Sequence, residues 1–455
     1  MPAADADVLA ELVQVESELD TRWPETKIEP SLTRISALTH LLGDPQVTYP
    51  AIQIAGTNGK SSTTRMIDAL LTRLGLRTGR FTSPHLQLVT ERIGIDGAPI
   101  DPQRYVEVYR DVEPFLEMVD ANSEVRITKF EALTAMAYAA FADAPVDVAV
   151  VETGLGGSWD ATSIIIPKVA VVGPVGIDHV EYLGPDLLGI AAEKAGIIKA
   201  GSVAILAEQD PGVARVLLER CAEVDATVAR QGLEFGVEHR DVAVGGQMVS
   251  LQGLGGVYTD IFLPLHGAHQ ADNAARALAA VEVFFGAGAD RMLDIEAVRE
   301  AFATLVVPGR MERMRTAPSV FIDAAHNPHG AAALAAALDG EFDFRRLVGV
   351  VGVMADKDVA GILTALEPVF TDLVVTTNSS PRAMDPDLLA GLAIDIFGDE
   401  RVVVAPRLDD AIEVAVGLAE ETDDPNEPVA GGGVVITGSV VTAGDARTLF
   451  GKEPA

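Results

Sequence analysis

The feature that most constrains the fold of this chain is a glycine-rich loop placed between an apolar segment and an amphipathic one. Residues 51–55, AIQIA, form an uncharged run that is typical of a buried strand. Residues 61–75 repeat apolar side chains at helical spacing and end on a glycine, as a capped helix does. The loop between them, residues 56–62, therefore turns a strand into a helix. Main-chain N–H groups at such a turn bind phosphate oxygens.

This loop matches only the second half of the common phosphate-binding pattern, in which Gly is followed by four residues and then Gly-Lys-Ser/Thr. Ile54 stands where the first glycine of that pattern belongs. Gly56 and Gly59 keep the loop free of side chains, and Lys60 supplies a positive charge for the terminal phosphates. The tripeptide Gly-Lys-Ser by itself is about as typical of a plain surface turn as of a phosphate-binding loop. The flanking strand and helix favour the phosphate site.

Strand and helix patterns alternate along most of the 455 residues, which predicts an α/β fold. Residues 9–42 have a helical pattern. Residues 146–152 and 168–172 are typical of strands in a parallel sheet, and each run leads into a polar, glycine-containing loop. Residues 240–265 alternate and turn on glycines, which predicts a small β-rich annex.

A second series of strands and helices begins after PGRMERM and predicts a doubly wound α/β domain of its own. The chain is also long for a single core. We place the boundary near Pro308 and expect two domains, residues 1–307 and 308–455. The acidic stretch 420–433 is predicted to be a surface loop.

The charge balance limits the partners of this protein. Lys and Arg total 34 against 67 Asp and Glu, a formal net charge of −33, and a surface of this sign repels nucleic acid and anionic lipid. The first twenty residues are acidic where a signal peptide would be basic and then apolar. We expect a cytoplasmic protein that binds neither nucleic acid nor membranes.

Polar residues at the ends of three predicted strands are candidate magnesium ligands. Glu152 ends an apolar run, Asp178 and His179 follow the next strand, and Ser83 follows a third strand-like run in GRFTSPH. Ligands of open α/β sheets bind at this edge, and Mg²⁺ prefers oxygen ligands. Capping or solvation is the more common role for each residue singly. Their shared location favours the metal site, because a glutamate at the end of a buried strand needs a partner.

Lys194, in AAEKAGIIK, leaves two alternatives open. An ammonium group beside a divalent metal would be repelled, so an unmodified Lys194 would pair with Glu193 or with a phosphate. A lysine close to the metal would need chemical alteration, for instance to a carbamate. The sequence by itself favours a surface position.

The second domain offers further candidates. IDAAHNP places Asp323, His326 and Asn327 at a strand end, and Arg310 follows the predicted boundary. Arg310 could neutralise charge during phosphoryl transfer, although an interdomain ion pair is a serious alternative. Asp323 could instead cap the next helix.

With these residues identified, the sequence resembles folylpolyglutamate synthase and the related dihydrofolate synthase, within the Mur ligase superfamily. The shortened loop GTNGK is the form that this superfamily uses. The matching segments run through almost the whole chain: RISALTHLLGDPQ, IAGTNGKSS, TSPHLQLVTERI, FEALTAMAY, VVETGLGGSWDAT, GIDHVEYLG, EKAGIIK, HQADN, PGRMERM, IDAAHNP and ITGSV.

The resemblance implies a Mur-ligase-type ATPase domain, with a parallel sheet and the β annex, followed by a Rossmann-like glutamate-ligase domain. It implies two Mg²⁺ ions, one at Ser83 and Glu152 and one at Glu152 and His179. Lys194 matches a lysine that relatives carry as a carbamate, and His326 matches a histidine near the acyl phosphate and glutamate. The implied ATP-binding residues are Gly56, Thr57, Asn58, Gly59, Lys60, Ser61, Ser62, Asn273, Arg310 and Asp323.

The implied reaction joins L-glutamate to dihydropteroate and to reduced folates. The γ-phosphate of ATP activates a carboxylate as an acyl phosphate, and the amino group of glutamate attacks it, with release of ADP and phosphate. The catalytic residues would be Lys60, Lys194, His326 and Arg310. We expect the protein to be a monomer. The implied pterin site comprises Thr128, Phe130, Glu131, Trp159, Asp160 and Ala161.

This chain departs from the usual pattern of the family at two positions. Relatives commonly have GGRxDATN where this chain has GGSWDATS, so Ser158 replaces an arginine and Ser163 an asparagine. We expect the loss of a cation from an anion-binding region to change the preferred pterin form or its affinity.

Three alternatives remain. A cell-wall precursor ligase of the same superfamily is the nearest, and TKFE and WDA argue against it by resemblance. A nucleotide-binding switch that hydrolyses without ligation would be supported by a guanine-specific Asn-Lys-x-Asp segment, which the chain lacks. A folate-binding protein without catalysis is disfavoured by retained Lys60, Glu152 and His179.

Overall fold

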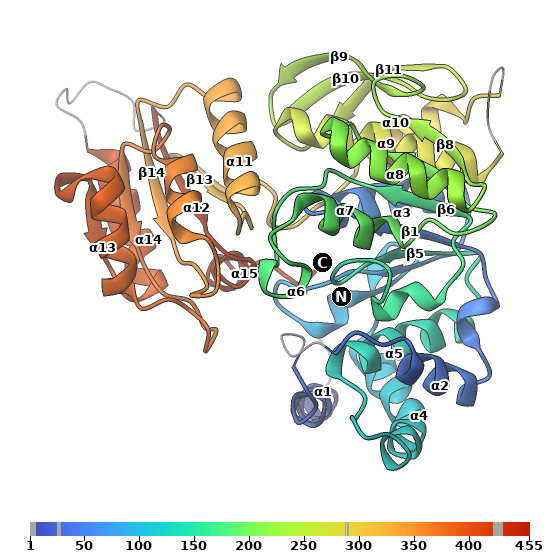
Figure 1. The fold of residues 1–455 in the computed structure, drawn as a ribbon. Helices are drawn as coiled ribbons and strands as arrows, with labels where there is room; N and C mark the ends of the chain where they lie inside the picture. Colours follow the sequence, from blue (N-terminus) through green and yellow to red (C-terminus); the bar gives the residue numbers. More distant parts are fainter. Residues whose placement is uncertain (1–5, 25–28, 287, 289–290, 422–430) are drawn as a thin grey trace.

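The computed structural model describes residues 6–24, 29–286, 288, 291–421 and 431–455. Two α/β bodies lie side by side, with a small antiparallel sheet above the first of them (Figure 1). The first body contains the N-terminal part of the chain and the second contains the C-terminal part. The predicted α/β fold with a β annex and a second doubly wound sheet is confirmed.

The first body is built on an eight-stranded sheet in the order β4-β3-β2-β5-β1-β6-β7-β8. The strands from β2 to β8 in this order run parallel, and β3 and β4 extend the sheet in antiparallel fashion. The strands are β1 Ala51–Ala55, β2 Thr78–Phe81, β3 Ile93–Ile95, β4 Ala98–Pro99, β5 Val148–Glu152, β6 Val169–Val172, β7 Val203–Leu206 and β8 Thr227–Arg230.

Helices cover both faces of this sheet because its central strands are apolar on both sides. Ala149 and Val151 face α1, α2, α4 and α5, whereas Val148 and Val150 face α3, α9 and α10. The helices are α1 Ala6–Asp20, α2 Thr33–Leu41, α3 Lys60–Arg73, α4 Pro102–Ala121, α5 Lys129–Asp143, α6 Val180–Leu183, α7 Leu187–Ala195, α8 Pro211–Glu223, α9 Ala268–Phe284 and α10 Ile295–Ala303. Short 3-10 turns are η1 Pro45–Val47, η2 Val89–Arg92 and η3 Ala161–Ile164.

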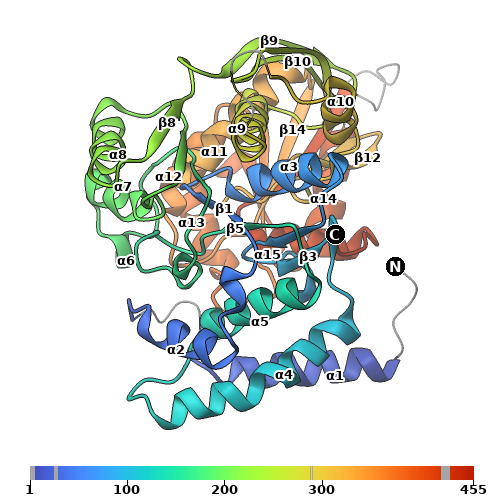
Figure 2. The same cartoon turned by 90° about the vertical axis from the view of Figure 1, so that its right-hand side faces the viewer.

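The annex is an antiparallel sheet in the order β11-β10-β9, formed by β9 Gly236–Ala243, β10 Gly246–Gln252 and β11 Val257–Leu263. Its apolar face packs on α9 and α10 in the same core as the face of the large sheet that bears α3. Figure 2 shows the annex above α9 on the side of the molecule away from α1 and α4.

The second body has a six-stranded sheet in the order β12-β13-β17-β14-β15-β16, parallel except for β12. Helices α11 to α13 cover one face and α14 and α15 cover the other. The elements are β12 Glu312–Thr316, β13 Ser319–Ile322, α11 Pro328–Glu341, β14 Arg346–Val351, α12 Val359–Leu366, β15 Asp372–Val375, α13 Pro386–Phe397, η4 Asp399–Arg401, β16 Val402–Val404, α14 Leu408–Glu420, β17 Gly432–Thr437 and α15 Val440–Leu449.

The predicted continuous helical pattern over residues 9–42 is wrong in its middle. Two helices occupy this region, because α1 ends at Asp20 and α2 begins at Thr33. Pro24 and Pro30 lie between the two helices and account for the break, since proline lacks the N–H that a helix needs and restricts the residue before it. The predicted acidic loop at 420–433 falls largely on residues 422–430, outside the described residues. The domain division near Pro308 stays a prediction.

A buried ion pair joins α3 to β2 in the first body. Arg80 Nη1 donates to Asp68 Oδ2 at 2.7 Å, and neither side chain is more than 3% exposed. Removal of one partner leaves an uncompensated charge in the core, which costs far more than the intact pair contributes.

Arg80→Met is therefore expected to lower the free energy of unfolding of the first body by about 3–5 kcal/mol. The double variant Arg80→Met/Asp68→Leu should recover most of this loss because it removes both charges. Chemical denaturation followed by tryptophan fluorescence measures both. A double variant no more stable than the single one would contradict this account.

Candidate active site

The phosphate loop leaves β1 and enters α3 through two glycines with positive φ angles. Gly56 has φ +155° and Gly59 has φ +79°. A Cβ on Gly56 would lie 3.2 Å from Gly173 Cα, and one on Gly59 would lie 2.6 Å from Asn273 Oδ1. Both positions therefore require glycine, because the loop is pressed against the end of β6 and against α9.

Lys60 begins α3, and its side chain lies across the loop. Its Nζ donates to the carbonyl oxygens of Gly56 at 3.1 Å and Thr57 at 3.3 Å. Ser61, the next residue, donates its hydroxyl to Glu152 Oε1 at 3.0 Å. The loop thus presents a cation and hydroxyl groups at one end of the helix.

Glu152 ends β5 as a buried carboxylate that is only partly satisfied. It is 1% exposed, and its Oε2 atom has no hydrogen-bond partner among the described residues. Burial raises the pKa of this carboxyl to about 7, although the positive charges of Lys60 and Arg310 oppose the rise. An unbonded buried carboxylate oxygen of this kind fits a cation as its missing partner.

The three predicted metal ligands follow strands that meet at one edge of the sheet. Ser83 follows β2, Glu152 ends β5, and His179 lies beyond the end of β6, where it precedes α6. No cluster of three or more His, Cys, Asp or Glu side chains in the described residues could hold a metal alone. The donor set is one buried carboxylate, a serine hydroxyl and an imidazole. This set fits Mg²⁺ when phosphate oxygens and water complete its six ligands.

Lys194 lies inside the site, so the surface position that its sequence favoured is wrong. It is 5% exposed, and its Nζ donates to Gly56 O at 3.1 Å, which is a contact with the phosphate loop and not with Glu193. Burial lowers the pKa of Lys194 to about 7, and the positive charge of Lys60 adds to this effect. A substantial fraction of the amine is therefore neutral near pH 7.

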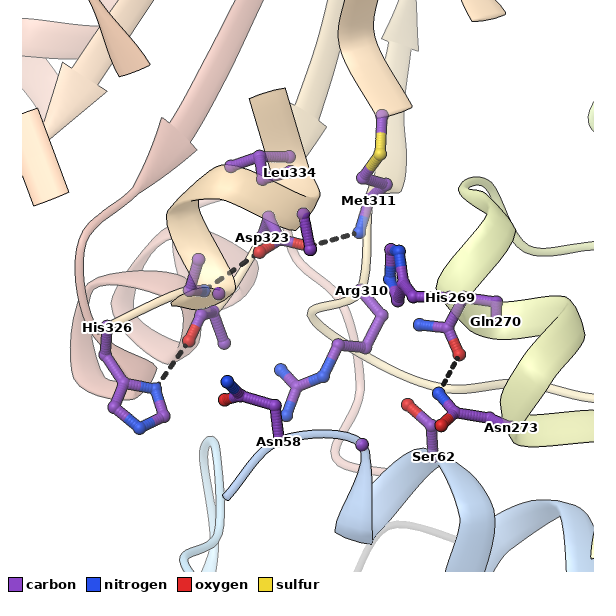
Figure 3. Close-up of a pocket in the computed structure, with 15 residues that line it drawn as sticks. Asn58, Ser62, His269, Gln270, Asn273, Arg310, Met311, Asp323, His326 and Leu334 are labelled. Carbon is purple, nitrogen blue, oxygen red and sulfur yellow. Dashed lines mark hydrogen bonds between the residues drawn. The ribbon is translucent and has the colours of Figure 1, made fainter. Parts of the chain in front are cut away.

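The opposite wall of the site comes from the second body. Figure 3 shows Arg310 extending from it toward Asn58 and the start of α3. Asp323 is 9% exposed and accepts from the N–H groups of Met311 and Ala325, both at 2.9 Å. Asp323 thus braces the segment that bears Arg310 and does not cap the following helix, a role that Asn327 takes.

A pocket lies between these walls, and its space of about 540 Å³ is continuous with open solvent. Asn273 on α9 forms part of its floor and donates to Gln270 Oε1 at 3.0 Å (Figure 3). The pocket-lining residues that bear polar or ionisable side chains are Asn58, Ser62, His269, Gln270, Asn273, Arg310, Asp323 and His326.

Contacts between the bodies bring in Lys357, a residue to which we assigned no role. The side-chain amides of Asn58 and Asn327 donate to each other at 3.3 and 3.2 Å. Asn327 also donates to Asp178 at 2.9 Å, and Lys357 pairs with Asp178 at 3.1 Å. All four residues follow strand ends. This position is the only feature of the sequence that could have marked Lys357 as a residue of the site. Their pairing across the cleft depends on how the two bodies dock.

His326 lies at the side of this network, beyond Asn58 in Figure 3. Its Nδ1 is 2.9 Å from the carbonyl oxygen of Ala324, and its Nε2 is 4.0 Å from Asp178. The ring is therefore oriented by its own main chain. Its Nε2 nitrogen therefore remains available to a ligand in the cleft.

The predicted pterin residues fall into two groups by what their side chains contact. Thr128 and Glu131 form the capping box of α5, and Glu131 also pairs with Arg34 at 3.1 Å in the core. Asp160, 3% exposed, accepts from the main-chain N–H groups of Leu155 and Thr162. These carboxylates hold the loops in place.

Phe130, Trp159 and Ala161 make up the second group. Phe130 is half-buried, and a Cβ on Gly154 would lie 2.5 Å from its ring, so the glycine makes room for it. Trp159 is also half-buried, and Ala161 is buried at the start of η3. Within this group, only the two aromatic rings offer free apolar surface to a ligand.

Both serines that replace family residues have structural contacts. Ser158 donates its hydroxyl to Glu193 O at 3.2 Å and its N–H to the same oxygen at 3.0 Å, next to Lys194. Ser163 is buried and accepts from Gln53 Nε2 at 3.0 Å. Each serine therefore has a hydrogen-bonding role of its own in this region.

The raised pKa of the buried Glu152 carboxyl predicts how the stability of the protein depends on pH. Because its pKa is raised from 4.5 to about 7, ionisation favours the unfolded chain, and this group removes stability as pH rises between those values. We compare the free energy of unfolding of metal-free Glu152→Gln with that of the metal-free parent. The difference in favour of the variant should increase by about 3 kcal/mol between pH 4.5 and pH 8. Thermal unfolding at several pH values measures this difference. Parallel curves for the two proteins would contradict it.

Comparisons with known proteins show what this chain is similar to. The Mur ligase middle domain matches residues 54–281, and the Mur ligase glutamate ligase domain matches residues 309–439. The dihydrofolate synthase/folylpolyglutamate synthase of Mycobacterium tuberculosis is 60% identical over 98% of this chain and 96% of its own. The folylpolyglutamate synthase of Lacticaseibacillus casei is 34% identical over 92% and 94%.

Solved structures extend the likeness to three dimensions. Folylpolyglutamate synthase of M. tuberculosis complexed with ADP has a TM-score of 0.94 at 59% identity, over 98% of this chain and 100% of that one. An FPGS–AMPPCP–folate complex has a TM-score of 0.82 at 29% identity, over 96% and 99%. The chain therefore belongs to the Mur ligase family, in its dihydrofolate synthase/folylpolyglutamate synthase group.

Proposed function

We propose that this chain joins L-glutamate to dihydropteroate and to reduced folates, using ATP and an acyl-phosphate intermediate. Membership of the family makes it an ATP-dependent ligase that forms C–N bonds. The observation that supports the proposal most strongly is the pocket between the two bodies. It brings Arg310 from one side against a glycine loop and helix N-terminus on the other.

The ATP phosphates are assigned to residues 56–62, and Asn273 and Asp323 complete the nucleotide site from α9 and from the end of β13. Main-chain N–H groups of the loop bind phosphate oxygens, and Lys60 exchanges its bonds to Gly56 O and Thr57 O for the terminal phosphates. Arg310 approaches the same point from the opposite wall. Two cations then stabilise the charge that develops on the transferred group.

Magnesium is assigned to Glu152, Ser83 and His179, with two ions that share Glu152. The unbonded Oε2 of Glu152 supports this assignment. When bound, Mg²⁺ neutralises phosphate charge and orients the phosphoryl group.

Lys194 is assigned a carbamate. Its neutral amine can add CO₂, with formation of an N–C bond and release of one proton, which turns a cation into an anion beside the metal site. Its burial and its pKa of about 7 support this step, because only the neutral amine reacts.

The acid substrate is assigned to the region of Thr128, Phe130 and Glu131 and to Trp159, Asp160 and Ala161. The rings of Phe130 and Trp159 would contact the pterin, while the carboxylates hold the loops. His326 is assigned to the incoming glutamate and the acyl phosphate. Because one chain supplies every assigned group, we propose that the protein works as a monomer, in the cytoplasm. No helix of the described residues is long and apolar enough to cross a bilayer.

One assay separates this function from its alternatives. ADP formation is measured with dihydropteroate or tetrahydrofolate, each with and without L-glutamate. A ligase turns over only when acid and amine are both present. Turnover without either would identify a nucleotide-hydrolysing switch, and turnover only with a cell-wall precursor would identify the other type of Mur ligase.

Lys60→Ala should reduce ADP formation about 100-fold or more with every acid substrate, because it removes a positive charge that stabilises the phosphates inside the cleft. Lys168→Ala, which removes an exposed lysine from the same body, is the matched control. Activity of Lys60→Ala within tenfold of the control would remove Lys60 from the mechanism.

Incubation with ¹³C-bicarbonate at pH 8 should give a carbamate ¹³C resonance that is absent from Lys194→Met. The reason is the depressed pKa of this amine, which leaves it largely neutral at pH 8. A spectrum in which the parent and Lys194→Met are identical would overturn the carbamate.

A further inference from the structure

The helix α15 of the second body packs against the loop of the first body that contains Ser83. In Figure 2 α15 lies close to the C-terminus of the chain. Gly444 of α15 touches the carbonyl oxygen of Leu86, and a Cβ at position 444 would collide with this oxygen. The absence of a side chain there lets the helix reach the loop.

Gln87 makes three hydrogen bonds across this contact. Its Nε2 donates to Thr448 Oγ1 at 3.2 Å and to Lys452 O at 2.8 Å, and its Oε1 accepts from Arg447 Nε at 2.9 Å. Arg447 is 3% exposed and is held in turn by Glu312 and by the carbonyl oxygen of Glu453. The partners of Gln87 are thus fixed groups of the second body.

The same loop is held from inside the first body by Glu91. This carboxylate, 3% exposed, accepts from the N–H groups of Leu86 at 2.8 Å, Gln87 at 3.0 Å and Leu88 at 3.1 Å. Within the first body the loop is also held by Arg92, whose Nε donates to His85 Nδ1 at 2.9 Å. The anchor at Gln87, by contrast, exists only while α15 is docked. Ser83 lies four residues before Gln87.

The loop, α15 and Arg310 also share one small pocket. Its lining includes Pro84 and Glu91 from the loop, Val440 from α15, Ser61 from α3, and Pro308 and Arg310 from the connection between the bodies. Movement of the second body therefore changes the surroundings of Arg310 and of Pro84, the residue next to Ser83, together.

We infer that Gln87 is a positioning residue, which couples docking of the second body to the placement of the Ser83 hydroxyl. This inference rests on the proposed role of Ser83 as a magnesium ligand. When the second body moves away, Gln87 loses all three partners, and the loop keeps only contacts within the first body, such as those of Glu91 and the bond from Arg92 Nε to His85 Nδ1. The metal ligand and Arg310 then reach their places in the same step, so phosphoryl transfer is confined to the closed cleft.

The test compares Gln87→Ala with Gln103→Ala, an exposed glutamine of α4 in the same body. Hydrogen–deuterium exchange of the peptide covering residues 82–92 should be about tenfold faster in Gln87→Ala, the effect of losing one or two hydrogen bonds. The Mg²⁺ concentration for half-maximal ADP formation should rise about three- to tenfold, with kcat at saturating Mg²⁺ changed much less. Exchange equal to that of Gln103→Ala overturns the inference, as does faster exchange with an unchanged Mg²⁺ requirement.

Gly444→Ala provides a second variant that leaves Gln87 in place and pushes the helix off the loop. Its control is Gly391→Ala, a helix glycine of α13 with open space around it. Alanine is the better helix former at both positions, so faster exchange of residues 82–92 in Gly444→Ala alone supports the contact itself. Equal exchange of residues 82–92 in Gly444→Ala and Gly391→Ala overturns the inference.

Ser83→Ala separates this inference from the proposed function. An unchanged Mg²⁺ titration in Ser83→Ala removes Ser83 from the metal site and with it the proposed consequence of Gln87. A raised Mg²⁺ requirement in Ser83→Ala but not in Gln87→Ala keeps the metal site and overturns the positioning role.

Discussion

The structure depends on a carboxylate that the fold buries without satisfying. Glu152 ends the central strand β5 with one oxygen bonded to Ser61 and the other to nothing among the described residues. Burial of this kind is costly unless a cation completes the site. Lys194 has the complementary problem, since its amine is buried against the phosphate loop and donates to Gly56 O. Both groups make sense as parts of a site that is completed by ligands.

The second constraint is that neither body contains the whole site. The glycine loop, Glu152 and Lys194 belong to the first body, whereas Arg310 and His326 follow the connection to the second. The reciprocal amide pair of Asn58 and Asn327 joins the phosphate loop directly to the second body. An acyl phosphate hydrolyses in water, so a site that exists only when two bodies meet is suited to protect it.

Local patterns predicted a large part of this arrangement. The strand, loop and helix from β1 to α3, the annex, and the alternation after Pro308 could be predicted because side-chain period and glycine placement are local properties. The helical pattern over residues 9–42 failed in its middle, where Pro24 and Pro30 outweigh the periodicity. Strands β7 and β8 were not predicted, since short apolar runs at the end of a sheet resemble helix segments.

The sequence by itself indicated the family through its resemblance to known members. It also determined the phosphate loop and the strand-end positions of Ser83, Glu152 and His179, because these follow from residue type and spacing. Only the tertiary structure decided that Lys194 is buried against Gly56, that Asp323 braces the segment bearing Arg310 and that Gln87 contacts α15. Most of those contacts join residues that lie far apart in the chain. Burial and pairing at such distances depend on how the two sheets and their helices dock, and no local pattern records that.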